Sequence, residues 1–300
     1  MKNNVLVLGG TCYCTVVYLD ELPEPKTQSI RSIGAHVTLG QMGTGKSLNL
    51  KHLGFNTTLQ AYIGNDEYGK RIIDFFSDKN INFSYDYDSA GTENHINIMD
   101  SHGERISITT CKTSFEPVIN YEKMENLIKN SDYIALNIYN YNRHLIPLIK
   151  KYTKEIWCDL DDYEPDNKYF DDFANAADYI TMSSIYLKDY KSVMKRFLDA
   201  GKKMVVCTHG NKGATHLTKE GKYIDTPIID DYKLVDANGA GDSFFSALMY
   251  AYSQGFSMEK SMKVATIVAG LCISSNELCH PELSIDLVKK EYKRIYNEDL

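Results

Sequence analysis

Apolar runs that alternate with helical stretches constrain the fold of this chain most strongly. Between residues 121 and 208, segments with helix-type apolar spacing alternate with short apolar runs such as 133–137 and 204–208. This alternation predicts a parallel sheet covered by helices on both faces, because each parallel crossover carries a helix back across the sheet. Long helical stretches follow at 242–255, 257–274 and 285–297. We therefore expect an α/β fold with three layers, α/β/α, and a mostly parallel central sheet.

Two stretches, at about 11–39 and 92–112, have a different pattern. Apolar and polar residues alternate in their short strands, which is typical of a sheet with one solvated face. We expect the two stretches to pair as a small β-sheet lid. Ligands of open parallel sheets bind outside the carboxyl ends of the strands, and a lid would cover that place. The prediction is a single domain over 1–300 with this lid inserted in it.

Charge and hydropathy exclude several classes of function. The 33 Lys and Arg against 40 Asp and Glu leave a net charge of −7, whereas nucleic-acid-binding proteins usually carry a basic face. No run approaches the roughly 20 apolar residues of a membrane span. The N-terminal residues lack the long apolar segment and cleavage site of a signal peptide. We expect a cytoplasmic protein with neither nucleic acid nor membrane as a partner.

The most informative segment is D-A-N-G-A-G-D at 236–242. An apolar strand end leads into Gly239-Ala240-Gly241, and a helix is expected to begin near Asp242. The first amides of a helix lack internal partners and the helix dipole is positive there, so this turn could hold a phosphate group. A carboxylate beside it could take a proton from an attacking hydroxyl. The structural alternative is that Asp242 caps the helix and the glycines only make a tight turn.

A second glycine-rich segment, G-Q-M-G-T-G-K-S at 40–47, matches the P-loop pattern G-x-x-x-x-G-K-[ST] letter for letter. In a P-loop, backbone amides and the Lys hold phosphates. The preceding residues 35–39 are mixed in character, unlike a central parallel strand, and they lie inside the lid-like stretch. A P-loop NTPase or kinase is therefore an alternative, although it leaves 236–242 unexplained.

The segment 236–242 resembles the D-T-x-G-A-G-D signature of the PfkB, or ribokinase-like, carbohydrate kinases, with Ala237 in place of the usual Thr. Residues 205–214 resemble that family's strand and T-x-G-x-x-G turn along the nucleotide. Residues 63–69 resemble its G-x-D-x-x-G segment, and 40–54 lie where the family has its sugar-binding turn and helix. The resemblance covers nearly the whole chain. It implies a ribokinase-like fold and an ATP-dependent phosphotransferase that acts on a hydroxyl of a sugar or sugar-like molecule.

The resemblance also implies roles for individual residues. Asp242 would be the general base, and the amides of Gly239, Ala240 and Gly241 would form the anion hole. The nucleotide would contact Thr208, Gly210, Gly213 and Asn238. The acceptor would contact Cys14, Gly40, Gly43, Thr44, Gly45, Lys46, Asn137 and Tyr139. In this interpretation Lys46 lies either at the wall of the acceptor site or in solvent.

The implied cofactors are ATP and Mg²⁺, with K⁺ as a further expectation. Asp236 lies where many members of the family hold a monovalent cation near the anion hole. A lid sheet leaves strand edges open, and pairing of two lids would cover them. We therefore expect a homodimer formed through the lid.

Three departures from the family pattern bear on the substrate and the metal. Cys14 stands where the family usually has an Asp that holds sugar hydroxyls, and Gly45 stands where it usually has an Asn. Ser183 and Tyr186 replace an N-x-x-E pair that organises Mg²⁺ through water. These changes predict an acceptor that is held in an unusual way, such as a modified sugar, a polyol or a nucleoside-like molecule. They also leave open a non-catalytic sensor that binds a sugar or nucleotide on a kinase scaffold.

Overall fold

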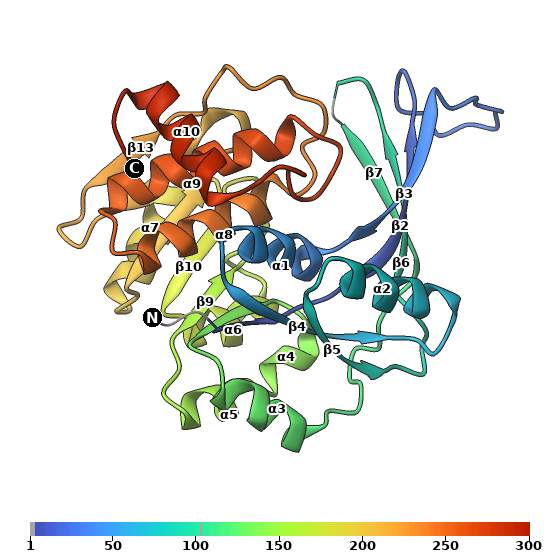
Figure 1. The fold of residues 1–300 in the computed structure, drawn as a ribbon, viewed down its shortest axis with the longest axis horizontal. Helices are drawn as coiled ribbons and strands as arrows, with labels where there is room; N and C mark the ends of the chain where they lie inside the picture. Colours follow the sequence, from blue (N-terminus) through green and yellow to red (C-terminus); the bar gives the residue numbers. More distant parts are fainter. Residues whose placement is uncertain (1–3, 103) are drawn as a thin grey trace.

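The computed structural model describes residues 4–102 and 104–300, which form the layers seen in Figure 1. Residues 1–3 and Gly103, the last of which belongs to the predicted lid segment 92–112, lie outside the described residues. The strands of the larger sheet are β1 (Asn4–Leu8), β4 (Asn56–Ile63), β5 (Asn82–Tyr87), β8 (Tyr133–Asn137), β9 (Ile156–Asp159), β10 (Tyr179–Ser183), β11 (Met204–Thr208), β12 (Ala214–Leu217) and β13 (Tyr223–Thr226). Their order in space is β13-β12-β11-β10-β9-β8-β1-β4-β5.

The larger sheet is parallel from β11 to β5, and β12 and β13 add an antiparallel edge. Most residues of its central strands β1, β8 and β11 are apolar, as expected of strands that are buried on both faces. In β1, Val5 and Val7 pack into the core on one face, whereas Leu6 and Leu8 pack into the core on the other. The alternation of side chains along a strand therefore explains why this strand has no polar face.

Helices cover both faces of the larger sheet (Figure 1). The helices are α1 (Met42–His52), α2 (Glu67–Asp78), α3 (Tyr121–Lys129), α4 (Asn140–Arg143), α5 (Ile146–Lys151), α6 (Asp171–Ala176), α7 (Tyr190–Asp199), α8 (Ala240–Ser253), α9 (Met258–Ile273) and α10 (Ile285–Tyr296), with short 3₁₀ turns at Lys168–Phe170 and Gly210–Lys212. Helices α1, α2, α8, α9 and α10 share one apolar core, and α3, α5, α6 and α7 share the other. None of the helices within the described ranges has the length and apolar composition to cross a membrane.

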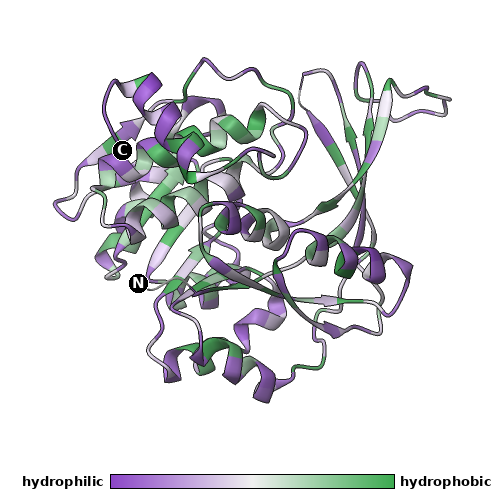
Figure 2. Ribbon diagram, in the orientation of Figure 1, coloured by the Kyte–Doolittle hydropathy of each residue, from purple (hydrophilic) through white to green (hydrophobic). Residues whose placement is uncertain are grey.

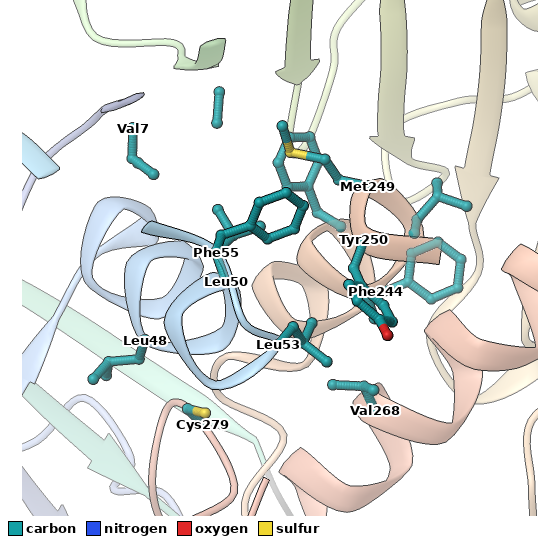
Figure 3. Close-up of a cluster of buried hydrophobic side chains, with 14 of the residues drawn as sticks. Val7, Leu48, Leu50, Leu53, Phe55, Phe244, Met249, Tyr250, Val268 and Cys279 are labelled. Carbon is teal, nitrogen blue, oxygen red and sulfur yellow. The ribbon is translucent and has the colours of Figure 1, made fainter. Parts of the chain in front are cut away.

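Helices α1 and α8 lie side by side in the first of these cores. Figure 3 shows Leu50 and Phe55, from α1 and the segment after it, packed towards Met249 and Tyr250 of α8. Every residue of α8 from Ser243 to Ala251 is buried. Because both helices are fixed by this packing, the residues at their N-terminal ends are held in defined positions.

The smaller sheet is formed by β2 (Cys12–Tyr18), β3 (Gly34–Gly40), β6 (Asn94–Met99) and β7 (Arg105–Cys111), in the order β3-β2-β6-β7. It projects from the body of the molecule beside α1 and α2 (Figure 1). Its strands carry both hydrophilic and hydrophobic residues (Figure 2), and the two kinds alternate along β3 and β7. The predicted α/β fold, with a mostly parallel sheet and a smaller second sheet, is confirmed.

Two details of the predicted elements are wrong. The sequence analysis predicts no strand at Asn82–Tyr87, where β5 forms a partly exposed edge of the larger sheet. It also expects the helix after the glycine-rich turn to begin near Asp242, but α8 begins at Ala240 and its N-cap is Gly239. Asp242 therefore lies in the first turn of α8 and is not its N-cap.

Candidate active site

A cavity of about 490 Å³ lies between the larger sheet and the lid. Its walls come from the lid strands, the start of α1, the end of β9 and the turn before α8. The residues that line it are Cys12, Cys14, Gly40, Gln41, Met42, His95, Asn97, Met99, Arg105, Ser107, Asp159, Asp161, Ala237, Asn238, Gly239, Gly241, Asp242 and Leu278. The cavity therefore lies beyond the carboxyl ends of parallel strands, where open α/β sheets bind their ligands.

The turn before α8 has the geometry of an anion-binding helix start. Gly239 has a φ of 82°, and a Cβ there would lie 2.9 Å from the Cα of Leu278, so both the backbone and the space require glycine. Gly241 and Asp242 belong to the first turn of α8, whose amides have no acceptor within the helix. The position where Gly241 would carry a Cβ is open space. This turn can therefore present amides and the positive end of the helix dipole to an anion in the cavity.

Side chains hold the same turn from both sides. The Asn238 amide donates to Oδ1 of the buried Asp236 at 2.7 Å. The Asn238 side-chain oxygen accepts a hydrogen bond of 3.1 Å from Arg105 of the lid strand β7. The Ala240 amide donates to the Ala237 carbonyl at 3.3 Å, which makes Ala240 the least available of the three amides predicted to form an anion hole.

Asp242 is paired with a buried lysine. The Lys46 ammonium donates to Asp242 Oδ1 at 2.6 Å and to Asp159 Oδ2 at 3.1 Å, and the Lys46 side chain is only 1% exposed. The other oxygen of Asp159 accepts a hydrogen bond of 2.8 Å from Thr181. The cavity wall thus contains two carboxylates that share one cation behind the wall.

Burial and charge act in opposite directions on these groups. The pKa of the Asp242 carboxyl is raised overall, because burial outweighs the charge and hydrogen bond of Lys46, which lower it. Burial alone would lower the pKa of Lys46, but the carboxylates of Asp242 and Asp159 outweigh this effect and raise the pKa above its ordinary value. Lys46 therefore stays a cation throughout the physiological pH range. Burial and the nearby charges of Asp159 and Asp162 raise the pKa of Asp161 to about 6.

The lid contributes a polar wall to the cavity. Asn97 donates to the Cys14 sulfur at 3.1 Å and accepts from the Ser107 hydroxyl at 2.6 Å. Burial raises the pKa of Cys14, so this residue is present as a thiol. The wall thus offers amide and hydroxyl groups that could bind the hydroxyls of an acceptor.

Gln41 joins the lid to α1 and has an unusual backbone. It is the N-cap of α1 with φ 77° and ψ 152°, a region that is normally restricted to glycine. Its side-chain amide nitrogen, Nε2, donates to Glu93 Oε1 at 2.5 Å, and His95 Nε2 lies 2.9 Å from the same oxygen. Gln41 and His95 both line the cavity, whereas Glu93 is buried behind them. Glu93 therefore orients two side chains that face the cavity.

The residues predicted to hold the nucleotide lie together at the carboxyl end of β11. Thr208 is the last residue of β11, and its hydroxyl is 3.4 Å from the Met182 carbonyl of the neighbouring β10. Gly210 and Gly213 have φ angles of 57° and 90°. A Cβ on Gly213 would lie 2.9 Å from the Cα of Pro227, so this turn needs glycine. Thr208, Gly210 and Gly213 are not among the residues that line the cavity described above.

Several residues predicted to contact the acceptor lie beneath the cavity. Gly43 packs closely against Gly10, and the Thr44 hydroxyl donates to Thr11 at 2.9 Å. Asn137 donates to the Leu8 carbonyl at 3.1 Å. Tyr139 is half-buried, and its buried hydroxyl closely approaches Gly10. Among the predicted acceptor contacts, the cavity wall includes Cys14 and Gly40.

Lys46 needs a correction, because it lies neither at the cavity wall nor in solvent. Its side chain is turned inward, and the preceding Gly45 allows this arrangement. A Cβ on Gly45 would lie 2.9 Å from both the Cβ and the Cγ of Asp242. Gly45 and Lys46 therefore form the surface against which Asp242 packs.

The P-loop alternative for 40–47 does not fit the structure. The strand before this segment, β3, belongs to the lid and pairs antiparallel with β2. The Lys46 ammonium is occupied by two carboxylates. A P-loop would instead follow a strand of the parallel sheet and present its lysine to phosphates.

Sequence reasoning missed a group of polar cavity residues on the lid or next to it. They are Gln41, His95, Asn97, Arg105 and Ser107. A signal was present, because polar side chains occur at every second position of 95–97 and 105–107 and therefore share one face of each strand.

Known proteins resemble this chain in sequence and in fold. The family model described as pfkB family carbohydrate kinase matches residues 170–284. The chain is 26% identical to an acarbose 7(IV)-phosphotransferase of Actinoplanes sp., over 88% of this chain and 90% of that protein. It is 22% identical to a ribokinase of Dictyostelium discoideum, over 91% of this chain and 95% of that protein.

Solved structures show the same fold. A microbiome-derived acarbose kinase superposes with a TM-score of 0.87 at 24% identity, covering 97% of this chain and 99% of that one. Arabidopsis thaliana ribokinase, solved with ribose and ATP, superposes with a TM-score of 0.79 at 19% identity, covering 96% and 99%. These likenesses establish the ribokinase fold. The family match over 170–284, the relatives and the motif at 236–242 together make this chain similar to the PfkB, or ribokinase-like, carbohydrate kinases.

Proposed function

We propose that this protein transfers the γ-phosphoryl group of Mg·ATP to a hydroxyl of a sugar-like acceptor, with Asp242 as the general base. The observation that carries this proposal is the position of Asp242. Its carboxylate lies on the cavity wall, in the first turn of helix α8, which is fixed by the core and begins with an anion-binding turn. A base and an anion site in contact with one cavity are the two parts that phosphoryl transfer needs from a protein.

In the proposed reaction, the acceptor oxygen forms a bond to the γ-phosphorus while the bond from that phosphorus to the β,γ-bridging oxygen breaks. The hydroxyl proton passes to Asp242, and ADP leaves. The amides around Gly239 and Gly241 stabilise the negative charge on the phosphoryl oxygens during transfer. Burial of Asp242 beside the lid limits the access of water, which would otherwise compete with the acceptor.

ATP would extend from this anion site towards Thr208, Gly210 and Gly213, with Asn238 between the two. Mg²⁺ enters as part of Mg·ATP in this proposal, because it needs few protein ligands when phosphates and water supply the others. Within residues 4–102 and 104–300, no three His, Cys, Asp or Glu side chains are grouped so as to hold a metal. Ser183 ends β10 and Tyr186 is exposed, so neither supplies a carboxylate there.

The acceptor would bind against the lid wall. Gln41, His95, Asn97 and Ser107 offer polar groups there, and the Cys14 thiol replaces a carboxylate. This wall supports an acceptor with many hydroxyls that is not held by an aspartate. Acarbose is the first acceptor to test, because two of the similar proteins described above are named for it.

The decisive experiment measures ADP release from Mg·ATP with acarbose, ribose, other sugars, polyols and nucleosides. Asp242→Asn is run in parallel. We expect turnover that depends on one class of acceptor and is lost in the variant. ATP binding without turnover across the whole panel would favour the non-catalytic sensor, and hydrolysis that needs no acceptor and survives in Asp242→Asn would overturn the assigned mechanism.

We also propose a homodimer formed through the lid. The face of the lid turned away from the cavity carries Val37, Ile106 and Ile108, which are 53%, 37% and 44% exposed. Exposed apolar sheet faces and strand edges are usually covered by a partner. Light scattering of the purified protein should give about twice the chain mass, and Ile108→Glu should give the mass of one chain.

The predicted monovalent ion is a separate proposal. Asp236 is buried beside the turn, and one of its oxygens accepts the Asn238 amide. A cation bound by Asp236 would hold the turn before α8 in place, as the hydrogen bond from the Asn238 amide does. Initial rates in K⁺ that exceed those in Na⁺ at equal ionic strength would support it, and equal rates would exclude it.

A further inference from the structure

Lys46 is a buried cation for which the family motif provides no role. It lies on α1, and its ammonium donates to Asp242 and Asp159 at 2.6 and 3.1 Å. The same ammonium lies 5.0 Å from the centre of the Phe245 ring. Two carboxylates and an aromatic face thus enclose the cation. A charged group is seldom buried to this extent unless it is paired, so the two carboxylates are what allows the Lys46 ammonium to be buried.

The chain before Lys46 is adapted to this contact. Gly45 has no room for a side chain, because a Cβ there would collide with the Asp242 carboxylate. The close approach of α1 to the start of α8 therefore depends on a glycine immediately before the lysine. Asp242 contacts the backbone at Gly45 on one side and the Lys46 ammonium on the other.

The charges around Asp242 come from several elements. Lys46 of α1 is the cation in contact with it, and Asp159 at the end of β9 is a nearby anion that opposes ionisation. Asp161 also lies close enough to feel the charge of Asp242, and Tyr139 and Cys272 are uncharged neighbours of it because their own pKa values are raised. Burial and the Asp159 carboxylate favour the protonated form of Asp242, whereas Lys46 favours the carboxylate.

We propose that Lys46 is a positioning residue that keeps the general base Asp242 ionised and its carboxylate directed to the cavity. This inference rests on the proposed function, in which Asp242 accepts the hydroxyl proton. A base that is protonated at neutral pH cannot accept a proton, so an aspartate whose side chain is only 11% exposed is kept ionised more easily beside a cation. The cation is shared with Asp159, which holds the ammonium in place and weakens its effect on Asp242.

The inference predicts opposite shifts in two variants. Lys46→Met removes the cation, so the pKa of Asp242 should rise and the acidic limb of the kcat/KM profile should move to higher pH. The expected movement is about one pH unit or more, the usual effect of an opposite charge at this distance. Asp159→Asn removes the competing anion and should move the same limb to lower pH. Ser47→Ala is the matched control, because the Ser47 hydroxyl is buried on the same helix turn with no hydrogen-bond partner among the described residues.

The pH dependence of kcat/KM separates this role from a merely structural one. A uniform loss of activity in Lys46→Met with an unshifted acidic limb would overturn the inference, as would equal shifts in both variants. Should Lys46→Met fail to fold, Asp159→Asn still tests the sign of the shift. A ¹³C NMR titration of aspartate carboxyls, with the Asp242 signal assigned by its loss in Asp242→Asn, gives the same shifts without turnover. Turnover in the wild type that survives in Asp242→Asn would instead mean that the proposed function had failed.

Discussion

Two glycine-rich turns lead into two adjacent helices, and the two turns have different relations to the cavity. Before α8, the Gly239 turn faces the cavity, and Gly241 has open space around it. At the start of α1, Gly43 and Gly45 face the core, against Gly10 and Asp242. A glycine-rich helix start can therefore bind an anion or admit a close contact between helices. Whether its backbone faces open space decides between these roles.

Of the substitutions near these two turns, Asp242→Asn should have the largest effect, and the effect should be on turnover. Removal of a general base lowers kcat by roughly 10²- to 10⁴-fold, whereas the amides that hold the phosphates stay in place. Steady-state ADP release should show this loss, and calorimetry should show nearly unchanged ATP affinity. A parallel loss of ATP affinity would mean that Asp242 belongs to the nucleotide site.

Alanine at Gly45 and at Gly241 should separate the two turns by stability. Gly45→Ala forces a methyl group against Asp242, and overpacking of this kind costs about 1–3 kcal/mol. Gly241→Ala adds a methyl group in open space within a helix turn, where alanine is favoured over glycine by up to about 1 kcal/mol. Denaturant unfolding of both variants measures the difference. Equal changes in the free energy of unfolding would contradict the contrast between the core-facing and cavity-facing turns.

The N-caps of the two helices differ in a further way. Gly239 of α8 suits its positive φ, whereas Gln41 of α1 has a backbone conformation that normally needs glycine. Both Gln41→Gly and Gln41→Ala lose the side-chain bond to Glu93, but only the glycine variant relieves the backbone. The free energy of unfolding of Gln41→Gly should therefore be about 1–3 kcal/mol higher than that of Gln41→Ala. Two variants of equal stability would show that the backbone of Gln41 is unstrained.

The smallest effect is expected for nucleotide affinity in Lys46→Met. Because Lys46 lies behind the cavity wall, its loss should change the Kd for ATP by less than about tenfold, or 1.4 kcal/mol. Fluorescence or calorimetric titration with ATP measures this constant. A collapse of affinity would return the segment 40–47 to the P-loop interpretation.

The lid illustrates what a more careful analysis of the sequence could have found. The alternation in 92–112 predicts two strands, and β6 and β7 are present. The same alternation places His95 and Asn97 on one face, yet only the structure shows that this face lines the cavity. Apolar Ile106 and Ile108 lie on the other face of β7. Period-two alternation defines two faces of a strand, but it does not say which face meets a ligand.

The edge strand β5 was missed for a related reason. Its sequence, N-F-S-Y-D-Y, alternates aromatic and polar residues as a strand should. It has Asn and Asp among its residues, which are depleted in strands. Phe83 and Tyr85 nevertheless pack with their rings 5.3 Å apart, and β5 pairs with β4. Tertiary packing outweighed the local preference.

The sequence by itself determined the layered α/β class, the lid and the glycine-rich start of α8, because periodicity and glycine requirements are local properties of a chain. Only the tertiary structure decided the role of Lys46. Its partner Asp242 is 196 residues away, and the letters around Lys46 match a phosphate-binding pattern. The Lys46–Asp242 pair exists because α1 and α8 pack side by side in one core, and no local pattern specifies which two helices will do so.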